Sequence, residues 1–179
     1  ELQMDPKMGV AIYNSKILNC SNEVIAILAT IETCKNNLSE LFVYPSDIIS
    51  EVNENKIQIN KLMKKFEIST EHFNNKYGDH IVIYKIINEY AKLTKNNDQK
   101  KLDEYIYKYF IKKNTIQKAY KNYKKYKYNL KKINYKQIKT NFSLVSKILG
   151  CIAHAYKNNN ARLKGIGINY DTNKVENIR

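Results

Sequence analysis

The residues of this chain that could do chemistry are lysines and tyrosines, and most of them lie in one segment. Between Tyr105 and Tyr170 there are sixteen Lys and Arg residues and no Asp or Glu. The rest of the chain has fifteen basic and seventeen acidic residues, so the net charge of +14 comes from this segment alone. Eight of the fifteen tyrosines lie between Tyr105 and Tyr135. Lysines that neutralise phosphates, interleaved with rings that can stack on bases, are typical of a surface that binds a polyanion.

The spacing of apolar residues predicts a helix that carries these side chains, starting after about Asn114. One face recurs every three or four residues and consists of Ile116, Ala119, Tyr120, Tyr123, Tyr126, Leu130 and Ile133. The lysines fall mostly elsewhere on the helix, at Lys118, Lys121, Lys124, Lys125, Lys131 and Lys132. A tyrosine stripe is typical of a core and a lysine run of a solvated face, so the roles of Tyr120 and Tyr123 stay open. The long absence of acidic residues favours nucleic acid as the partner of the lysines.

Patterns that indicate catalysis are missing from the sequence, and we predict no catalytic residue. There is no GxxxxGK[ST] loop, no HExxH and no GxSxG. Residues 165–167 form a GxG without the third glycine of a dinucleotide-binding loop. Asp79 and His80 are adjacent, a spacing that favours helix capping and packing over a catalytic pair.

The cysteines and histidines predict neither a metal site nor a disulfide framework. The three cysteines have no CxxC spacing, and the three histidines are scattered. We therefore expect buried thiols in a reducing compartment, at Cys20, Cys34 and Cys151. No run of eighteen apolar residues occurs, so we expect no membrane partner.

The elements that position the basic segment are predicted to be helices, since five glycines and two prolines leave little room for tight turns. Asp5-Pro6 predicts a helix start, with Asp as cap and Pro in the first turn. A helix through residues 24–31 is apolar nearly all round and should be buried. Residues 41–45 should be extended, and further helices are expected over 46–66 at the surface, from Asp79 as cap to 93, over 102–110, and over 135–154. In the last of these, the inward residues should be Ile138, Phe142, Val145, Ile148, Leu149 and Ile152.

Six short motifs of this chain occur in the order and at the spacing that they have in one protein family, and together they extend over nearly the whole chain. They are Met-Asp-Pro-Lys-Met at 4–8 with Asn-Cys-Ser-Asn-Glu-Val-Ile at 19–25, Leu-Phe-Val-Tyr-Pro at 41–45, Gly-Asp-His at 78–80, Asn-Glu-Tyr at 88–90, Tyr-Phe-Ile at 109–111, and Ala-Arg-Leu-Lys-Gly-Ile-Gly at 161–167. This order resembles the helicase-associated region of DEAH-box RNA helicases. Residues 163–167 are most similar to the branch that acts in the second step of splicing.

The resemblance implies a mainly α fold, a helical bundle that begins a small β element at its C-terminus. Residues 1–10 would end a preceding winged-helix region, 5–159 would form a ratchet-like helical domain, and 160–179 would begin an OB-fold. Because the sequence starts at Glu1 without Met, we expect a piece of a longer protein.

The function implied by the resemblance is that of a non-catalytic accessory domain of an ATP-dependent RNA helicase in pre-mRNA splicing. Phosphates of single-stranded RNA would be held without sequence readout by Lys118, Lys121, Lys124, Lys125, Arg162 and Lys164. ATP and Mg would bind RecA-like domains of the same parent chain, not this segment. Those domains and spliceosomal proteins would be its partners, in the nucleus.

Two other functions remain open at this point. The chain could be a protein-interaction module whose basic face binds an acidic partner, or the helicase core itself, without contacting RNA. It could also be a free-standing enzyme, although the sequence offers no site for one. Salt-dependent RNA binding by the isolated chain separates the RNA-binding and protein-binding hypotheses.

Overall fold

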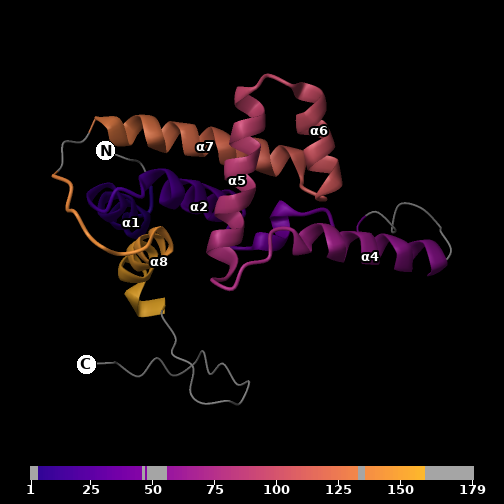
Figure 1. Cartoon of the computed structure of the whole chain (residues 1–179), viewed down its shortest axis with the longest axis horizontal. Helices are drawn as coiled ribbons and strands as arrows, with labels where there is room; N and C mark the ends of the chain where they lie inside the picture. Colours follow the sequence, from indigo (N-terminus) through magenta and orange to yellow (C-terminus); the bar gives the residue numbers. More distant parts are fainter. Residues whose placement is uncertain (1–3, 46, 48–55, 133–135, 160–179) are drawn as a thin grey trace, which may run out of the picture. The chain divides into compact units, whose positions relative to one another are not determined.

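The computed structural model describes residues 4–45, 47, 56–132 and 136–159, and this part of the chain is mainly helical, as predicted (Figure 1). With the labels of Figure 1, the helices are α1 (Pro6–Ile17), α2 (Ser21–Thr33), α4 (Lys56–Glu71), α5 (Asp79–Lys95), α6 (Gln99–Lys108), α7 (Lys113–Lys131) and α8 (Leu144–Ala155). Two 3₁₀ turns, η1 (Leu38–Leu41) and η2 (Lys157–Asn159), complete the list. The β element predicted at 160–179 lies outside the described residues. The chain divides into two compact units, residues 21–134 and residues 1–20 with 135–179.

The core of the unit formed by residues 21–134 is built around α2. Every side chain from Val24 to Thr30 is buried, which confirms the prediction of a central helix. Helices α5 and α7 both pack against α2 (Figure 1). A helix that is apolar on all sides needs neighbours on all sides, and α5 and α7 supply them.

The helix with the lysines, α7, is held on α2 by one apolar face and two polar contacts. Ile116, Ala119, Tyr126 and Leu130 are buried. The hydroxyl of Tyr126 donates a hydrogen bond to the Glu32 carboxylate. The amide of Asn122 donates to the hydroxyl of Thr33 over 3.2 Å. These contacts fix the rotation of α7 about its own axis, and therefore which residues face outward.

The start of α7 is fixed by a short backbone pairing with the segment after η1. Phe42 and Ile111 form an antiparallel bridge, and the Val43 N–H donates to the Phe110 carbonyl over 2.7 Å. Phe110 has φ +53° and reverses the chain between α6 and α7. The predicted extended piece at 41–45 is thus extended at Phe42, whereas Leu41 belongs to η1 and Pro45 is helical.

The start of α5 differs from the expectation that Asp79 caps it. The cap position is Gly78, which has φ +85° and makes no side-chain cap bond, and Asp79 is already in the first turn. Glycine adopts this positive φ without steric cost, so the chain enters the helix one residue earlier than expected. Asp79 still places its carboxylate at the positive end of the helix dipole.

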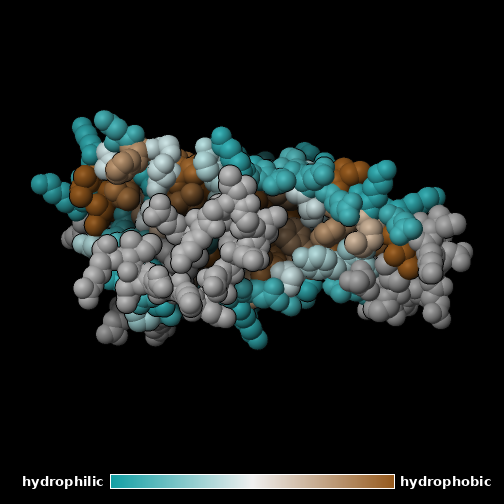
Figure 2. Space-filling model, turned by 90° about the horizontal axis from the view of Figure 1, so that it is seen from below, coloured by the Kyte–Doolittle hydropathy of each residue, from teal (hydrophilic) through white to brown (hydrophobic). Residues whose placement is uncertain are grey.

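Helix α4 (Lys56–Glu71) lies along the surface, as predicted, and ends at Glu71 and not at 66. Residues 46 and 48–55 of the predicted range lie outside the described residues. Most of its side chains are exposed, including Met63 and Ile68. The right-hand part of Figure 2, where α4 lies, is mostly hydrophilic with isolated hydrophobic patches. Its C-terminal end is anchored by aromatic rings, because His72 stacks on Tyr109 at 4.9 Å and Phe73 lies 4.8 Å from the same ring.

The unit formed by residues 1–20 and 135–179 pairs α1 with α8. Asp5 caps α1 as predicted, accepting from the backbone N–H groups of Lys7 and Met8 at 2.7 and 3.4 Å. Cys20 and Cys151 bring their sulfurs to 3.9 Å in the interior. Both cysteines, and Cys34 in the other unit, are buried, as predicted.

The helix predicted over 135–154 is wrong in its first half. Helix α8 begins at Leu144, where Ser143 caps it by accepting from the Ser146 N–H over 3.1 Å. Ile138 and Phe142 are 58% and 66% exposed and are not in the core, and Val145 and Leu149 are only half-buried. The Ile138 N–H donates a hydrogen bond of 3.0 Å to the Ile17 carbonyl, which lies far away in sequence. In a helix, the same N–H would donate to a carbonyl of the preceding turn instead. Ile148 and Ile152 are buried as predicted.

The contact between Tyr126 and Glu32 gives a stability prediction. We expect Tyr126→Phe to lower the free energy of unfolding by about 1 kcal/mol, because it removes the hydrogen bond to the Glu32 carboxylate. The loss stays this small because Glu32 is exposed, so water can solvate its carboxylate in the variant. The matched control is Tyr128→Phe on the exposed side of α7, for which a change under about 0.5 kcal/mol is expected. Urea denaturation followed by circular dichroism measures both. Equal losses in the two variants would contradict this role of Tyr126.

Buried phenols predict a loss of stability at high pH. Burial raises the pKa of both Tyr105 and Tyr126 above the ordinary value of about 10. The unfolded chain releases these protons at a lower pH than the fold, so their stabilisation is complete below about pH 10 and declines above it. We expect urea midpoints to fall above that pH, and to fall less steeply after Tyr105→Phe and Tyr126→Phe together. Full phenolate absorbance at 295 nm with unchanged helicity would show the prediction to be wrong.

Candidate nucleic-acid interface

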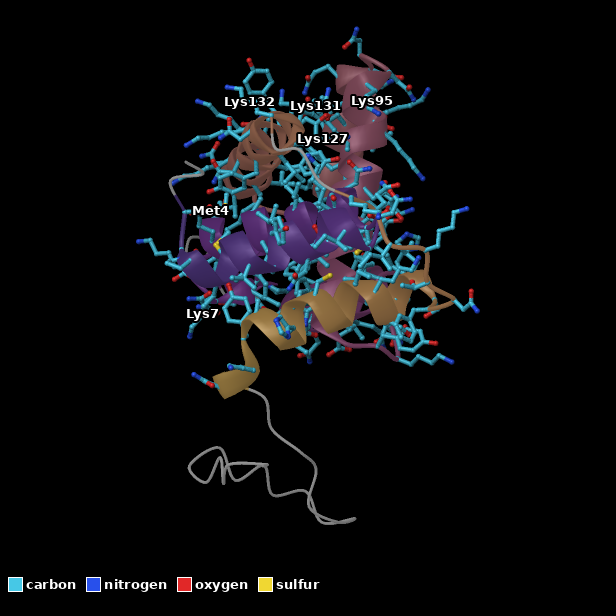
Figure 3. The ribbon with its side chains drawn as sticks, turned by 90° about the vertical axis from the view of Figure 1, so that its left-hand side faces the viewer. Met4, Lys7, Lys95, Lys127, Lys131 and Lys132 are labelled. Carbon is cyan, nitrogen blue, oxygen red and sulfur yellow. The ribbon has the colours of Figure 1, made fainter. Side chains whose placement is uncertain are left out.

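Helix α7 turns a continuous row of lysines outward. We call lysine face the six exposed lysines of this helix that lie opposite its buried residues, namely Lys118, Lys121, Lys124, Lys125, Lys131 and Lys132. Figure 3 looks along α7 and shows the labelled Lys131 and Lys132 on the side of the helix away from α2. With a rise of about 1.5 Å per residue, the backbone from Lys118 to Lys132 spans roughly 21 Å.

The structure brings four of the six predicted phosphate-binding residues together. Lys118, Lys121, Lys124 and Lys125 are all exposed on two successive turns of α7. Arg162 and Lys164 lie outside the described residues. The sequence prediction of sites left out Lys131 and Lys132, which continue the same face for another turn. Lys131 and Lys132 lie three and four residues after Tyr128, and this helical spacing could have identified them in the sequence.

Tyrosine rings of α7 support several of its ammonium groups. In three pairs a lysine follows a tyrosine by four residues and places its Nζ near the ring centroid: Tyr120–Lys124 at 5.0 Å, Tyr123–Lys127 at 5.6 Å and Tyr128–Lys132 at 4.7 Å. A ring face attracts a cation and costs little desolvation, so each pair limits where its lysine points. Two of these lysines, Lys124 and Lys132, belong to the lysine face.

Tyr120 and Tyr123, whose roles the sequence left open, are half-buried and pack mainly against other rings. Tyr120 meets Tyr90 of α5 edge-on at 5.4 Å and stacks with Tyr123 at 5.9 Å. Burial is the main reason that the pKa of each phenol is raised. Both rings thus belong to the packed side of α7, and Tyr120 also contacts the lysine face through Lys124.

The charges of the lysine face are not neutralised within the described part of the chain. There, ion pairs of α7 and its cap join Lys113 to Asp103 at 2.7 Å and Lys112 to Glu40 at 3.3 Å, both at the start of the helix. No described carboxylate lies within 4.0 Å of Lys118, Lys121, Lys124 or Lys125. Like charges three or four residues apart destabilise a helix by a few tenths of a kcal/mol per pair. The isolated fold bears this repulsion, which a bound anion would relieve.

Two hollows lined by described residues offer weaker candidate sites. One, of about 140 Å³, lies between η1 and α5 and is lined by Leu41, Phe42, Val82 and Ile86 among others, below the size of ordinary ligand sites. The other, of about 340 Å³, lies between α1 and α8 beside Cys151 and His154 and is mostly apolar and wide open. His80 is half-buried, and burial lowers its pKa. Among the described residues, no three His, Cys, Asp or Glu side chains are grouped as metal ligands would be.

None of the described helices combines the length and apolar character that crossing a bilayer requires.

Comparisons with protein-family models, curated proteins and solved structures gave no match to this chain. The lysine face of α7 is therefore the candidate site that the geometry of the molecule itself supports best.

Removal of the lysine charges should not weaken the fold. We expect replacement of Lys118, Lys121, Lys124 and Lys125 by Gln to raise the free energy of unfolding by roughly 0.8–2 kcal/mol at low salt, because four like-charge pairs disappear, three among these lysines and one between Lys124 and Lys127. The gain should shrink as salt screens the repulsion. The control is Lys113→Gln, which loses the ion pair with Asp103 and should lower the stability only slightly, because this pair is exposed to solvent. A large loss in the fourfold variant would mean that these lysines hold the structure together.

Proposed function

We propose that this chain is a non-catalytic module that binds single-stranded RNA through the lysine face of α7, as the helical accessory domain of a DEAH-box ATP-dependent RNA helicase. The observation that carries the proposal is a row of exposed lysines, without neighbouring carboxylates, on a helix whose other face is firmly packed. A rigid helix keeps these charges in place for a polyanion. A nucleic acid is such a polyanion, because its phosphates recur at regular intervals along the strand.

The chemistry of lysine determines what such a face recognises. An ammonium group is a compact point charge on a flexible stem, so it neutralises a phosphate without the fixed two-point geometry of arginine. Contacts of this kind carry affinity and position the strand, but they do not read bases. Binding through the lysine face should therefore be independent of base sequence and strongly dependent on salt.

The helicase context is supported by the structural roles of the motif residues that the structure describes. Asp5 and Pro6 start α1, and Gly78 uses its positive φ to start α5. Tyr109 and Ile111 flank the reversal that leads into α7. These are roles that a fold shared with the helicase-associated region would preserve. ATP and Mg would bind the RecA-like domains of the parent chain, and the splicing role in the nucleus rests on the likeness of residues 163–167.

The test is fluorescence anisotropy of a labelled single-stranded RNA against the whole chain, between about 50 and 200 mM salt. The variant replaces Lys118, Lys121, Lys124 and Lys125 by Gln. We expect its affinity to fall at least tenfold at the lowest salt, and the slope of log affinity against log salt to become shallower by about 3, since four phosphate contacts are lost.

The matched control replaces four other exposed lysines by Gln, at Lys61, Lys64, Lys65 and Lys76, and so has the same net charge. It should lose much less affinity than the α7 variant. Equal losses would mean that only total charge matters, and no binding of RNA at the lowest salt would overturn the proposal. In that second case the lysine face is better explained as a docking surface for an acidic protein or for the helicase core.

A further inference from the structure

Tyr128 differs from the other tyrosines of α7 because it does not contribute to the packing of the helix. Tyr126 is buried against α2, and Tyr120 and Tyr123 are half-buried among rings. The side chain of Tyr128, in contrast, is 63% exposed. An exposed aromatic ring is common on protein surfaces, so exposure alone assigns it no role. Its surroundings do.

All four positions that neighbour Tyr128 on the helix surface are lysines. Residues three and four positions away are the ones that a helical side chain meets, and here they are Lys124, Lys125, Lys131 and Lys132. All four are exposed. The ring therefore lies in the middle of the part of the lysine face where the positive charge is densest.

Another exposed tyrosine, on α6, has a ring contact of the same kind but different neighbours. Tyr107 of α6 is 78% exposed and also has a lysine near its ring, Lys65 at 5.7 Å. Its neighbours three and four residues earlier are Asp103 and Glu104, which would repel a phosphate chain. The two tyrosines are thus alike in exposure and ring contact and opposite in the charge around them.

We propose that Tyr128 stacks on an unpaired nucleobase while the surrounding lysines hold the adjacent phosphates. This inference rests on the proposed RNA binding and adds a preference for bases that are not in a duplex. Stacking of a base on an aromatic ring is stronger than an exposed contact between a lysine and a ring. An arriving base can therefore displace Lys132 from its position 4.7 Å from the ring centroid and free that ammonium group for a phosphate.

The preference for unpaired bases follows from geometry. The faces of bases inside a duplex are covered by their neighbours, whereas a single strand can turn a base out onto a ring. Stacking requires only a π face, so it distinguishes single from double strands without distinguishing one sequence from another. Tyr128 would give the lysine face a selectivity that lysines alone do not have.

The first experiment uses the absence of tryptophan from the chain, since Tyr128→Trp introduces a single tryptophan that can be excited apart from the tyrosines. The probes are an oligoadenylate of about ten nucleotides, a length within known single-strand site sizes, and an abasic oligomer with the same backbone and charge. We expect the oligoadenylate to quench Trp fluorescence strongly and the abasic oligomer to leave it nearly unchanged. The control, Tyr107→Trp, should respond to neither.

The second experiment measures affinity with Tyr128→Ser and Tyr128→Phe. We expect Tyr128→Ser to bind oligoadenylate about five- to hundredfold more weakly and the abasic oligomer equally well, and Tyr128→Phe to behave like the original chain. Normal oligoadenylate binding by Tyr128→Ser would overturn the stacking role and leave the proposed function standing. Equal losses on both oligomers would overturn it too, because the ring would then only position lysines. If the unaltered chain binds no RNA, both proposals fail together.

Discussion

The packing of α7 on α2 is the contact on which the rest of the larger unit depends. The buried run from Val24 to Thr30 leaves α2 no solvated side, so its neighbours have to present apolar surface to it. Helix α7 does so with Ile116, Ala119 and Leu130. The same requirement determines its other side, because a helix that buries one face of a Lys- and Tyr-rich sequence turns the remaining lysines outward together. The packing of α7 on α2 therefore determines which residues form the lysine face.

The sequence predicts an element of this fold where the pattern that defines the element is local in sequence, and fails where the element depends on a contact with a distant segment. The buried face of α7 and the apolar run of α2 follow from spacing alone, because the burial of a periodic face needs no knowledge of what covers it. The start of α8 does not follow. Ile138 and Phe142 continue the helical spacing, yet the Ser143 cap and the bond from Ile138 to Ile17 end it. A pattern along one segment contains no information about a carbonyl contributed by a distant one.

The candidate site shows the same limit in its aromatic residues. The lysines were predictable as a group, since long runs without acidic residues are visible in any composition. Tyr120 and Tyr123 share the predicted apolar face with Tyr126, whereas Tyr128 falls outside it, so spacing alone separates Tyr128 from the others. Spacing does not show what covers Tyr120 and Tyr123, which pack against rings of α5 and α7. Nor does it show the bond from Tyr126 to Glu32 that helps to fix the rotation of α7. These contacts are properties of the assembled core.

The division of the chain into two units has a consequence for the order of folding. The smaller unit joins α1 near the N-terminus to α8, and its cysteines are 131 positions apart in sequence. During synthesis, residues 21–134 are complete before α8 leaves the ribosome, so the larger unit can fold as soon as α7 has emerged. Until α8 follows, α1 lacks the helix with which it pairs in its own unit. Helix α1 is thus made before the whole larger unit, yet it can pair with α8 only after that unit is complete, and its apolar residues stay accessible to chaperones in the meantime.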